Sequence, residues 1–430
     1  MLIQFAVKNF RSFKDEAVLS LAASAIKELR DENTLRVSDN LALLKSAVIY
    51  GANASGKSNL IQAMKFMKWF VLNSSKETQV SSEKIKAERF KLHTETEKQP
   101  SVFEIIFIYD KIQYRYGFAV TEEEVVEEWL YYVLNKQELE VFTREKQKFD
   151  LSRHFKSEER LVQEKRVRPN VLFLSVSAQF NGAIANKIME WFSAEFKCIS
   201  SINSNHYGGI TLSFSEQEKG KKIILDFLKR ADVGIENFKL LKTNIDYEKL
   251  PAELKTMLKE KKGLIRVDVK TEHKKYDSKG KTAGLVDFDM NKEESYGTQK
   301  LFELSGPIID ALLKGKILAV DELDARLHPK LVRAVCELFN SKTHNPRGAQ
   351  LVFVSHNTNI LDKELLRRDQ IWFTEKDKYG ASELFSLVEF KDPKGGKKVR
   401  NDASYERSYL KGIYGAVPCA RDLEVKYGDG

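Results

Sequence analysis

The segment from Gly51 to Ser58 restricts the possible folds of this chain more than any other part of the sequence. Its eight residues, GANASGKS, follow the apolar run Ser46–Tyr50, which is typical of a strand buried on both faces. Beyond the segment, apolar residues recur with the period of a helix, at Leu60, Ile61, Met64, Phe66, Met67 and Phe70. A buried strand, a glycine loop and a helix in this order predict an α/β fold.

The loop has the spacing G-x-x-x-x-G-K-S, in which glycines let successive backbone N–H groups point at phosphate oxygens. The helix N-terminus adds partial positive charge, Lys57 can neutralise the β- and γ-phosphates, and the Ser58 hydroxyl can reach Mg²⁺. The alternative is an ordinary helix-capping turn, which the position between a buried strand and a helix disfavours. The sequence therefore predicts a site for ATP and Mg²⁺, with nucleotide-binding residues Gly51, Asn53, Ser55, Gly56, Lys57 and Ser58.

A second hydrophobic strand, Ile317–Val320, ends in two adjacent carboxylates, Asp321 and Glu322. The first carboxylate can hold Mg²⁺ through water, and the second can polarise a water molecule for attack on the γ-phosphate. Such a strand end is a weak signal alone, because apolar strands often end in acids at the edge of a sheet. After the phosphate loop it predicts Asp321 as a metal ligand and Glu322 as a catalytic residue, and it favours hydrolysis over kinase chemistry.

Two further segments are candidates for contacts with phosphate. His356 follows the apolar strand 352–354 at the edge where open α/β sheets bind ligands, although a lone histidine is more often an ordinary surface or core residue. Ser295 and Gly297 open a helix and can form a second anion site, with a plain N-cap as the alternative. Because one nucleotide needs one phosphate loop, this second turn suggests the ATP of a partner subunit.

These motifs together resemble the ATP-binding head shared by ABC, SMC and RecF-type ATPases. The matching segments are 8–13 (KNFRSF), Ser295–Gln299 as a degenerate signature motif, 321–329 as a Walker B strand running into the D-loop, and 354–357 around a switch histidine. The resemblance implies an ABC-type head, with a mixed sheet, an antiparallel β meander and a largely helical insertion. It also implies two heads arranged head to tail, with Lys57 and Ser58 of one sharing ATP with Ser295 and Gly297 of the other. Glu322 would then be the catalytic base and His356 the γ-phosphate sensor.

More narrowly, the head motifs and the closing segment 409–418 (YLKGIYGAVP) resemble bacterial AAA-type ATP/GTP phosphatases of anti-phage systems, such as AbiL-like and RloA-like proteins and the ATPase of PARIS. This resemblance implies a sensor or scaffold ATPase of abortive infection. Its partners would be further copies of itself and a separately encoded effector, expected to be a nuclease, with DNA or a phage protein as a possible trigger. The signature motif lacks the second glycine of transporters, and no long heptad repeat follows the head.

Four other functions compete with this interpretation. A RecF- or SMC-like DNA-repair ATPase would bind DNA in an ATP-dependent way without an effector. A self-contained nuclease needs clustered acids to hold metal, but the acids after His356, such as Asp362, Asp369 and Glu375, are scattered. A transporter ATPase does not fit the large middle section. A structural role with ATP as glue would show stable assembly and slow hydrolysis.

The periodicities predict four parts along the chain. Residues 1–143 form the first half of the head, 144–283 a helical and charged insertion that provides arms or docking surfaces, 284–390 the second half of the head, and 391–430 a tail. The expected meander strands are 101–109, 112–121, 124–134 and 138–143. Expected helices of the middle section are 182–196 and 215–231, with one strand at 263–271, and those of the second half are 298–313 and 328–341.

Composition sets the remaining limits. The chain has 71 Lys and Arg against 62 Asp and Glu, a net charge of +9 that permits nucleic-acid contact without requiring it. Its three cysteines show neither a disulfide framework nor zinc spacing. The N-terminus alternates like a strand and not like a signal peptide, and no run approaches the roughly 20 apolar residues of a membrane helix. We therefore expect a cytoplasmic protein without membrane contact.

Overall fold

The computed structural model describes residues 1–77, 80–134, 137–199, 206–245, 265–391, 396, 398–400 and 403–418, which form two compact units. The first unit comprises Met1–Ser201, Ala311–Asp324 and Val332–Gly430, and the second Ile202–Asp310 and Ala325–Leu331. The first unit continues past the expected boundary at residue 143, because Phe155, Trp191 and other apolar side chains of the following segment join its core.

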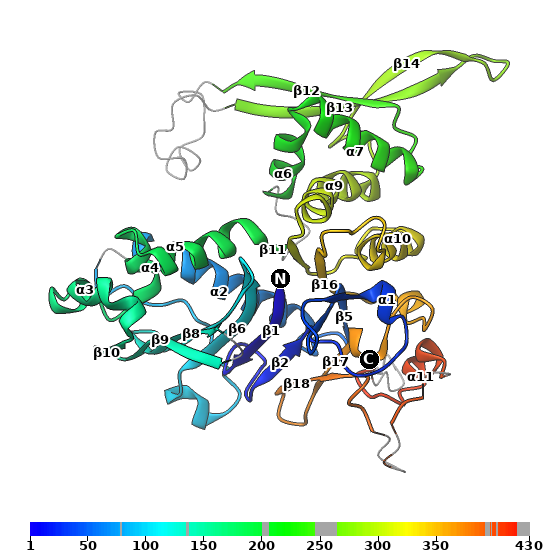
Figure 1. The fold of residues 1–430 in the computed structure, drawn as a ribbon. Helices are drawn as coiled ribbons and strands as arrows, with labels where there is room; N and C mark the ends of the chain where they lie inside the picture. The colour runs from blue at the N-terminus through cyan, green and yellow to red at the C-terminus, as the bar shows by residue number, and fades with distance from the viewer. Residues whose placement is uncertain are drawn as a thin grey trace, which may run out of the picture. The chain divides into compact units, whose positions relative to one another are not determined.

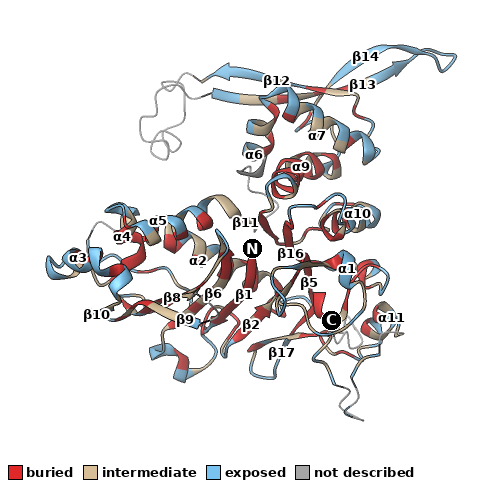
Figure 2. Ribbon diagram, in the orientation of Figure 1, coloured by how far each residue is buried: buried red, intermediate tan, exposed pale blue. Residues whose placement is uncertain are grey.

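A six-stranded sheet of the first unit carries the chemical motifs. Its strand order is β11-β15-β16-β5-β17-β18; the first five strands are parallel and β18 is antiparallel to β17 (Figure 1). All residues of β5, β15 and β16 are buried, as their apolar runs predict (Figure 2). The bounds are β5 (Ser46–Gly51), β11 (Phe196–Ile199), β15 (Ile317–Val320), β16 (Gln350–Val354), β17 (Ile371–Lys376) and β18 (Ser382–Ser386).

The edge strand β11 was not predicted. The expected helix 182–196 ends earlier, as α5 (Ala183–Glu190) followed by a π-helical turn, η3 (Trp191–Glu195). The chain then pairs in parallel with β15, from Phe196 opposite Ile317 to Ile199 opposite Val320. Pairing with a neighbour that is distant in the sequence decides the conformation of this short segment, since local periodicity alone cannot separate a short buried strand from a helix.

The second sheet of the first unit confirms the predicted antiparallel meander. Its order is β10-β9-β8-β7-β6-β1-β2, so each meander strand pairs with the next strand along the chain. Alternate side chains of its strands enter the core, among them Phe103, Phe107 and Phe118. The bounds are β1 (Leu2–Lys8), β2 (Ala17–Ser20), β6 (Ser101–Tyr109), β7 (Ile112–Val120), β8 (Val125–Leu134), β9 (Gln137–Glu145) and β10 (Lys148–Leu151).

The long helix after the glycine loop lies at the centre of the first unit. This helix, α2 (Lys57–Glu77), buries Leu60, Met64 and Met67 in the core that also receives the meander side chains. The other described elements are α1 (Arg30–Asn33), β3 (Thr34–Arg36), β4 (Ala42–Leu44), η1 (Thr94–Lys98), η2 (Arg153–Glu158), α3 (Glu159–Gln163), α4 (Phe173–Gln179), α10 (Pro329–Asn340), η5 (Thr358–Ile360), η6 (Arg368–Gln370) and α11 (Tyr405–Leu410).

The second unit contains helices and a three-stranded antiparallel sheet of order β12-β13-β14. The prediction of a largely helical insertion is therefore incomplete, since only the strand near 263–271 was expected. The missed strands are largely exposed, and their burial shows no sustained alternation between apolar buried and polar exposed positions (Figure 2). The bounds are α6 (His206–Ser215), α7 (Glu218–Arg230), β12 (Asn237–Asn244), β13 (Ile265–Tyr276), β14 (Thr282–Asp289) and α9 (Tyr296–Lys314). No helix among the described residues is long and apolar enough to cross a membrane.

A proline inside α9 is accommodated by a side chain of α6. Pro307 has no N–H, so the carbonyl of Glu303 one turn earlier lacks its usual helical donor. The buried hydroxyl of Thr211 donates to that carbonyl at 2.7 Å and accepts from the N–H of Gly306 at 3.1 Å. A side chain at Gly306 would lie 2.5 Å from the Thr211 Cα, so glycine permits this close contact between the helices.

A buried ion pair connects the meander to α4. Both side chains of Glu128 and Arg144 are fully buried, and their charged atoms lie 3.4 Å apart. Glu128 also accepts from the N–H groups of Phe173 and Leu174 at 2.7 and 3.0 Å, at the start of α4. The carboxylate of Glu128 therefore caps α4, and the guanidinium of Arg144 neutralises the charge of this carboxylate.

We expect Arg144→Met to destabilise the first unit by about 3–5 kcal/mol, because it leaves Glu128 charged and buried without its cation. Thermal and urea unfolding followed by tryptophan fluorescence would measure the loss. Arg115→Met is the matched control, since that side chain is 30% exposed and pairs with carboxylates near the surface. Equal effects of the two substitutions would contradict the role given to the buried pair.

Candidate nucleotide site

The loop between β5 and α2 is tightly packed against neighbouring backbone. Gly56 has a φ of 109°, and a Cβ there would lie 2.4 Å from the Ser382 Oγ and 2.7 Å from the Ser12 Oγ. A Cβ on Gly51 would lie 2.4 Å from the carbonyl oxygen of Thr374. Both positions of the motif require glycine because a Cβ would collide with neighbouring atoms. Gly56 is required also because its positive φ disfavours residues with a side chain. These contacts hold the loop in its curled form.

Lys57 lies at the start of α2 and folds back over the loop. Its Nζ donates to the carbonyl oxygens of Gly51 and Ala52 at 2.7 and 2.8 Å, and the residue is 5% exposed. Burial lowers the pKa of Lys57, while the carboxylates of Asp321, Glu322 and Asp324 raise it. The ammonium group therefore lies in the field of the acidic strand end.

The two predicted metal ligands are in direct contact. Ser58 Oγ donates to Asp321 Oδ1 at 2.9 Å, although the two residues are 263 positions apart in the chain. Asp321 is 8% exposed and follows β15, whose neighbour β16 lies between it and β5. A hydroxyl and a carboxylate are hard oxygen donors, and Mg²⁺ at phosphate sites takes one or two protein ligands plus phosphate and water. The donor set fits the predicted ion.

Glu322 occupies a strained turn directly after Asp321. Its φ of 50° is unusual for a residue with a side chain, and the N–H of the next residue, Leu323, donates to the Val354 carbonyl at 3.1 Å. Glu322 is half-buried. The turn thus places a partly accessible carboxylate beside a buried one.

His356 follows β16, the strand between the phosphate loop and the acidic strand end. Its N–H donates to Asp324 Oδ2 at 2.8 Å, and its side chain is exposed. Partial burial lowers the pKa of His356, the charge of Lys57 lowers it further, and Asp324 and Glu322 oppose the shift. The imidazole is therefore mostly neutral at pH 7, and it can donate one hydrogen bond without adding a full positive charge.

The predicted signature residues begin α9 in the second unit. Ser295 Oγ accepts from the N–H of Thr298 at 3.1 Å, which makes it the N-cap of this helix. A Cβ on Gly297 would lie 2.8 Å from the Arg326 carbonyl oxygen, so glycine is required there. Ser295 is exposed, and so is Tyr296, whose ring lies 4.6 Å from the Arg326 guanidinium. We call residues 294–298 the signature turn. Ser295 is therefore an N-cap, as the alternative interpretation predicted, and it lies at an exposed start of α9.

Several residues around the phosphate loop were not identified from the sequence. Asn59 Nδ2 donates to Ser12 Oγ at 2.7 Å, Ser382 Oγ donates to the Ser55 carbonyl at 2.6 Å, and Ser55 Oγ lies 2.6 Å from Thr374 Oγ1. Ser12 belongs to the N-F-R-S-F motif, which was identified from the sequence without a role for this serine. Thr374 lies on β17 and Ser382 on β18, and no local pattern distinguishes these hydroxyl side chains from others.

The closing segment 409–418 packs against the strand that leads into the phosphate loop. The ring of Tyr409 lies 5.6 Å from Tyr50 and 5.4 Å from Phe373, and its hydroxyl donates to the Ala416 carbonyl at 3.2 Å. A Cβ on Gly415 would lie 2.5 Å from Glu375 Oε2. The packing of residues 409–418 on this strand gives a structural reason why the segment occurs together with the phosphate loop. The sequence alone did not supply this reason.

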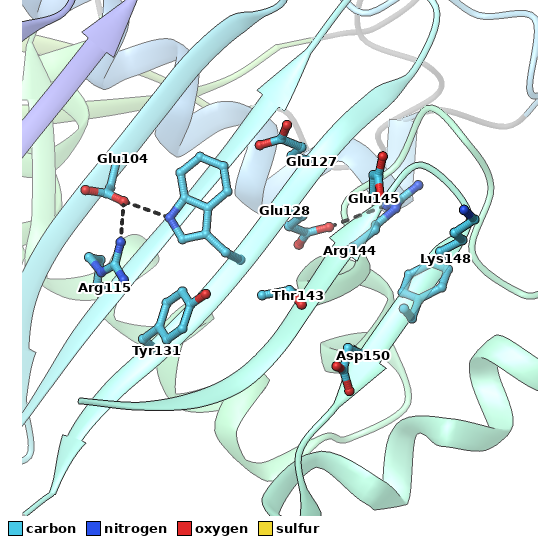
Figure 3. A pocket seen from close by; sticks show the side chains of 12 residues that line it. Glu104, Arg115, Glu127, Glu128, Tyr131, Thr143, Arg144, Glu145, Lys148 and Asp150 are labelled. Atoms are coloured by element: carbon cyan, nitrogen blue, oxygen red, sulfur yellow. Dashed lines mark hydrogen bonds and ion pairs between the residues drawn. The ribbon is translucent and has the colours of Figure 1, made fainter. Parts of the chain in front are cut away.

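A hollow of about 640 Å³ on the outer face of the meander is chemically unsuited to a nucleotide (Figure 3). Glu104 accepts from Trp129 at 2.7 Å and pairs with Arg115 at 3.3 Å. Glu127 and Glu145 lie directly opposite each other on β8 and β9. Carboxylates in this arrangement repel phosphate, and no glycine loop faces the hollow among its lining residues.

A comparison of the sequence with models of protein families agrees with the site described above. A family model described as "AAA domain, putative AbiEii toxin, Type IV TA system" matches residues 46–362. The chain belongs to this AAA family. Among solved structures, the SMC head domain from Thermotoga maritima is 14% identical, with a TM-score of 0.39, and the match covers 90% of this chain and 98% of that one. No curated protein sequence matches the chain.

We expect Lys57→Ala to weaken binding of Mg·ATP to this AAA-family chain by at least about a hundredfold, because a buried cation facing the phosphates is lost. Isothermal titration with ATP and Mg²⁺ would measure it. Lys76→Ala, on the exposed end of the same helix, is the control and should bind as the wild type does. Retained affinity in Lys57→Ala would exclude the loop as the nucleotide site.

Proposed function

We propose that this chain is an Mg²⁺-dependent ATPase that hydrolyses ATP at a site completed by a second copy of itself. The observation that carries the proposal is the 2.9 Å contact between Ser58 Oγ and Asp321 Oδ1, with Glu322 directly beside it. A bare phosphate-binding loop would serve a kinase or a binding protein equally well. The adjacent carboxylate supplies what hydrolysis needs in addition, a base next to the metal-ligand pair.

In this scheme, each site residue at the strand ends of the first unit has a defined task. The loop N–H groups and Lys57 hold the phosphates, and Ser58 and Asp321 would hold Mg²⁺, which offsets negative charge on the phosphates when bound. Glu322 orients the attacking water and accepts its proton. His356, at the end of the intervening strand, donates a hydrogen bond to the γ-phosphate. Binding and base catalysis therefore come from neighbouring strand ends of one sheet.

The proposed second copy contributes the signature turn. Ser295 and the N-terminus of α9 offer a hydroxyl, N–H groups and the positive end of a helix of 19 residues, all suited to phosphate. Ser295 and Tyr296 are exposed, as a surface that meets a partner's nucleotide must be. The turn would thus complete the site opposite Lys57 of the other copy.

We further propose that turnover controls a separately encoded effector in bacterial defence against phage, with a nuclease as the expected effector. The family description supports this direction because it names a toxin and a type IV toxin–antitoxin system. The second unit, with its exposed three-stranded sheet, offers surface for such a partner. A DNA-binding repair ATPase would use the same head chemistry but would need no effector.

Glu322→Gln is expected to bind Mg·ATP normally and to lower turnover by about a hundredfold or more, because an amide accepts no proton. Phosphate release measures turnover. Glu383→Gln, on an exposed position of β18, is the matched control. Near-normal turnover of Glu322→Gln would remove this residue as the base.

The same variant, isolated from its native host with ATP and Mg²⁺, separates the two biological functions. A stoichiometric second protein with nuclease activity supports effector control. DNA recovered without such a protein supports the repair function and contradicts the defence proposal.

Ser295→Arg is expected to prevent ATP-dependent pairing, because a long cationic side chain fills the space that the partner's phosphates would occupy. Binding of ATP to single chains should stay at the wild-type level. Sedimentation with and without ATP measures pairing, and Ser341→Arg, in a loop of the first unit, serves as the control. ATP-dependent pairing of Ser295→Arg would contradict the shared site.

A further inference from the structure

Glu294, the residue before Ser295, is buried and held by side chains of β13. Its side chain is 6% exposed, and its Oε1 lies 2.6 Å from Nε2 of His273. The hydroxyl of Thr271 donates to the same oxygen. Because a carboxylate oxygen accepts, the His273 Nε2 carries the proton of its hydrogen bond. Two donors from one strand thus hold this buried acid.

The backbone of Glu294 in turn holds the start of α9. Its carbonyl oxygen accepts from Nε2 of Gln299 at 3.0 Å, and the N–H of Gln299 donates to the Ser295 carbonyl at 2.9 Å. Ser295 Oγ caps the helix through Thr298. The position of the Ser295 hydroxyl therefore depends on the residue before it, and that residue depends on β13.

We propose that His273 and Thr271 are positioning residues for the signature turn: through Glu294 they set the place of Ser295 and so the affinity of one head for the ATP held by the other. This inference rests on the shared site proposed above and adds its regulation. Neither residue touches nucleotide in the scheme. Both act through Glu294, whose buried carboxylate would be costly to leave without donors.

The strand that carries these two residues also reaches the surface. β13 continues beyond His273 to Tyr276, which is 58% exposed, and its partner β14 presents Leu285, which is 53% exposed (Figure 2). Val286 of β14 lies directly opposite His273. His273 and Thr271 thus link the signature turn to a hairpin whose outer part is exposed.

The test measures turnover per chain as a function of protein concentration, with single-chain binding of a fluorescent ATP analogue measured separately. His273→Ala and Thr271→Val should each raise the protein concentration for half-maximal turnover about tenfold, the equivalent of one lost hydrogen bond to a charged group. Analogue binding to single chains should not change. His273→Gln should recover most of the loss, because its amide can donate to Glu294.

Lys275→Ala is the matched control, since it lies two residues further along the same strand and is exposed. Thr271→Val keeps the shape of the side chain and carries the test if His273→Ala does not fold. One outcome would overturn the positioning role but leave the shared site intact. In it, wild-type turnover rises with protein concentration, and His273→Ala and Thr271→Val behave as Lys275→Ala does. Wild-type turnover per chain that is independent of concentration would overturn the shared site, and this inference with it.

Discussion

The contact between Ser58 and Asp321 is the constraint on which the rest of the head depends. The two residues lie 2.9 Å apart only because β16 separates β5 from β15 and all three strands run in the same direction. Parallel strands present their carboxyl ends at one edge, so the glycine loop, His356 and the acidic pair meet there. The buried apolar residues of these strands fix that order. The chemistry of the site is therefore a consequence of strand order.

Around this edge, the structure uses distant parts of the chain to stiffen the phosphate loop. Ser12 of the N-terminal motif accepts from Asn59 in the first turn of α2, Ser382 of the last strand donates to the Ser55 carbonyl, and the ring of Tyr409 packs against Tyr50 just before the loop. Together these contacts leave little freedom for the loop to relax. In the proposed ATPase, a loop held in this way would lose little conformational entropy on binding a phosphate.

The second unit carries the turn that we propose to bind the phosphates of a second copy. Its signature turn is anchored through buried Glu294 to a strand of a different sheet, whose outer part is exposed. In the proposed shared site, this division lets the chain bind ATP alone and use it only when the second unit is correctly held.

Sequence alone determined the parts whose signal is local. The phosphate loop, the buried strands around it, the meander and the acidic strand end were readable because strand periodicity and glycine spacing are set by neighbours in the chain. Tertiary structure decided the rest. The segment after residue 190 became the strand β11 by pairing with β15, and pairing between β12, β13 and β14 formed the sheet of the second unit. Ser12, Ser382 and Glu294 acquired their roles only through contacts with residues far away in the chain, and no local pattern encodes such contacts.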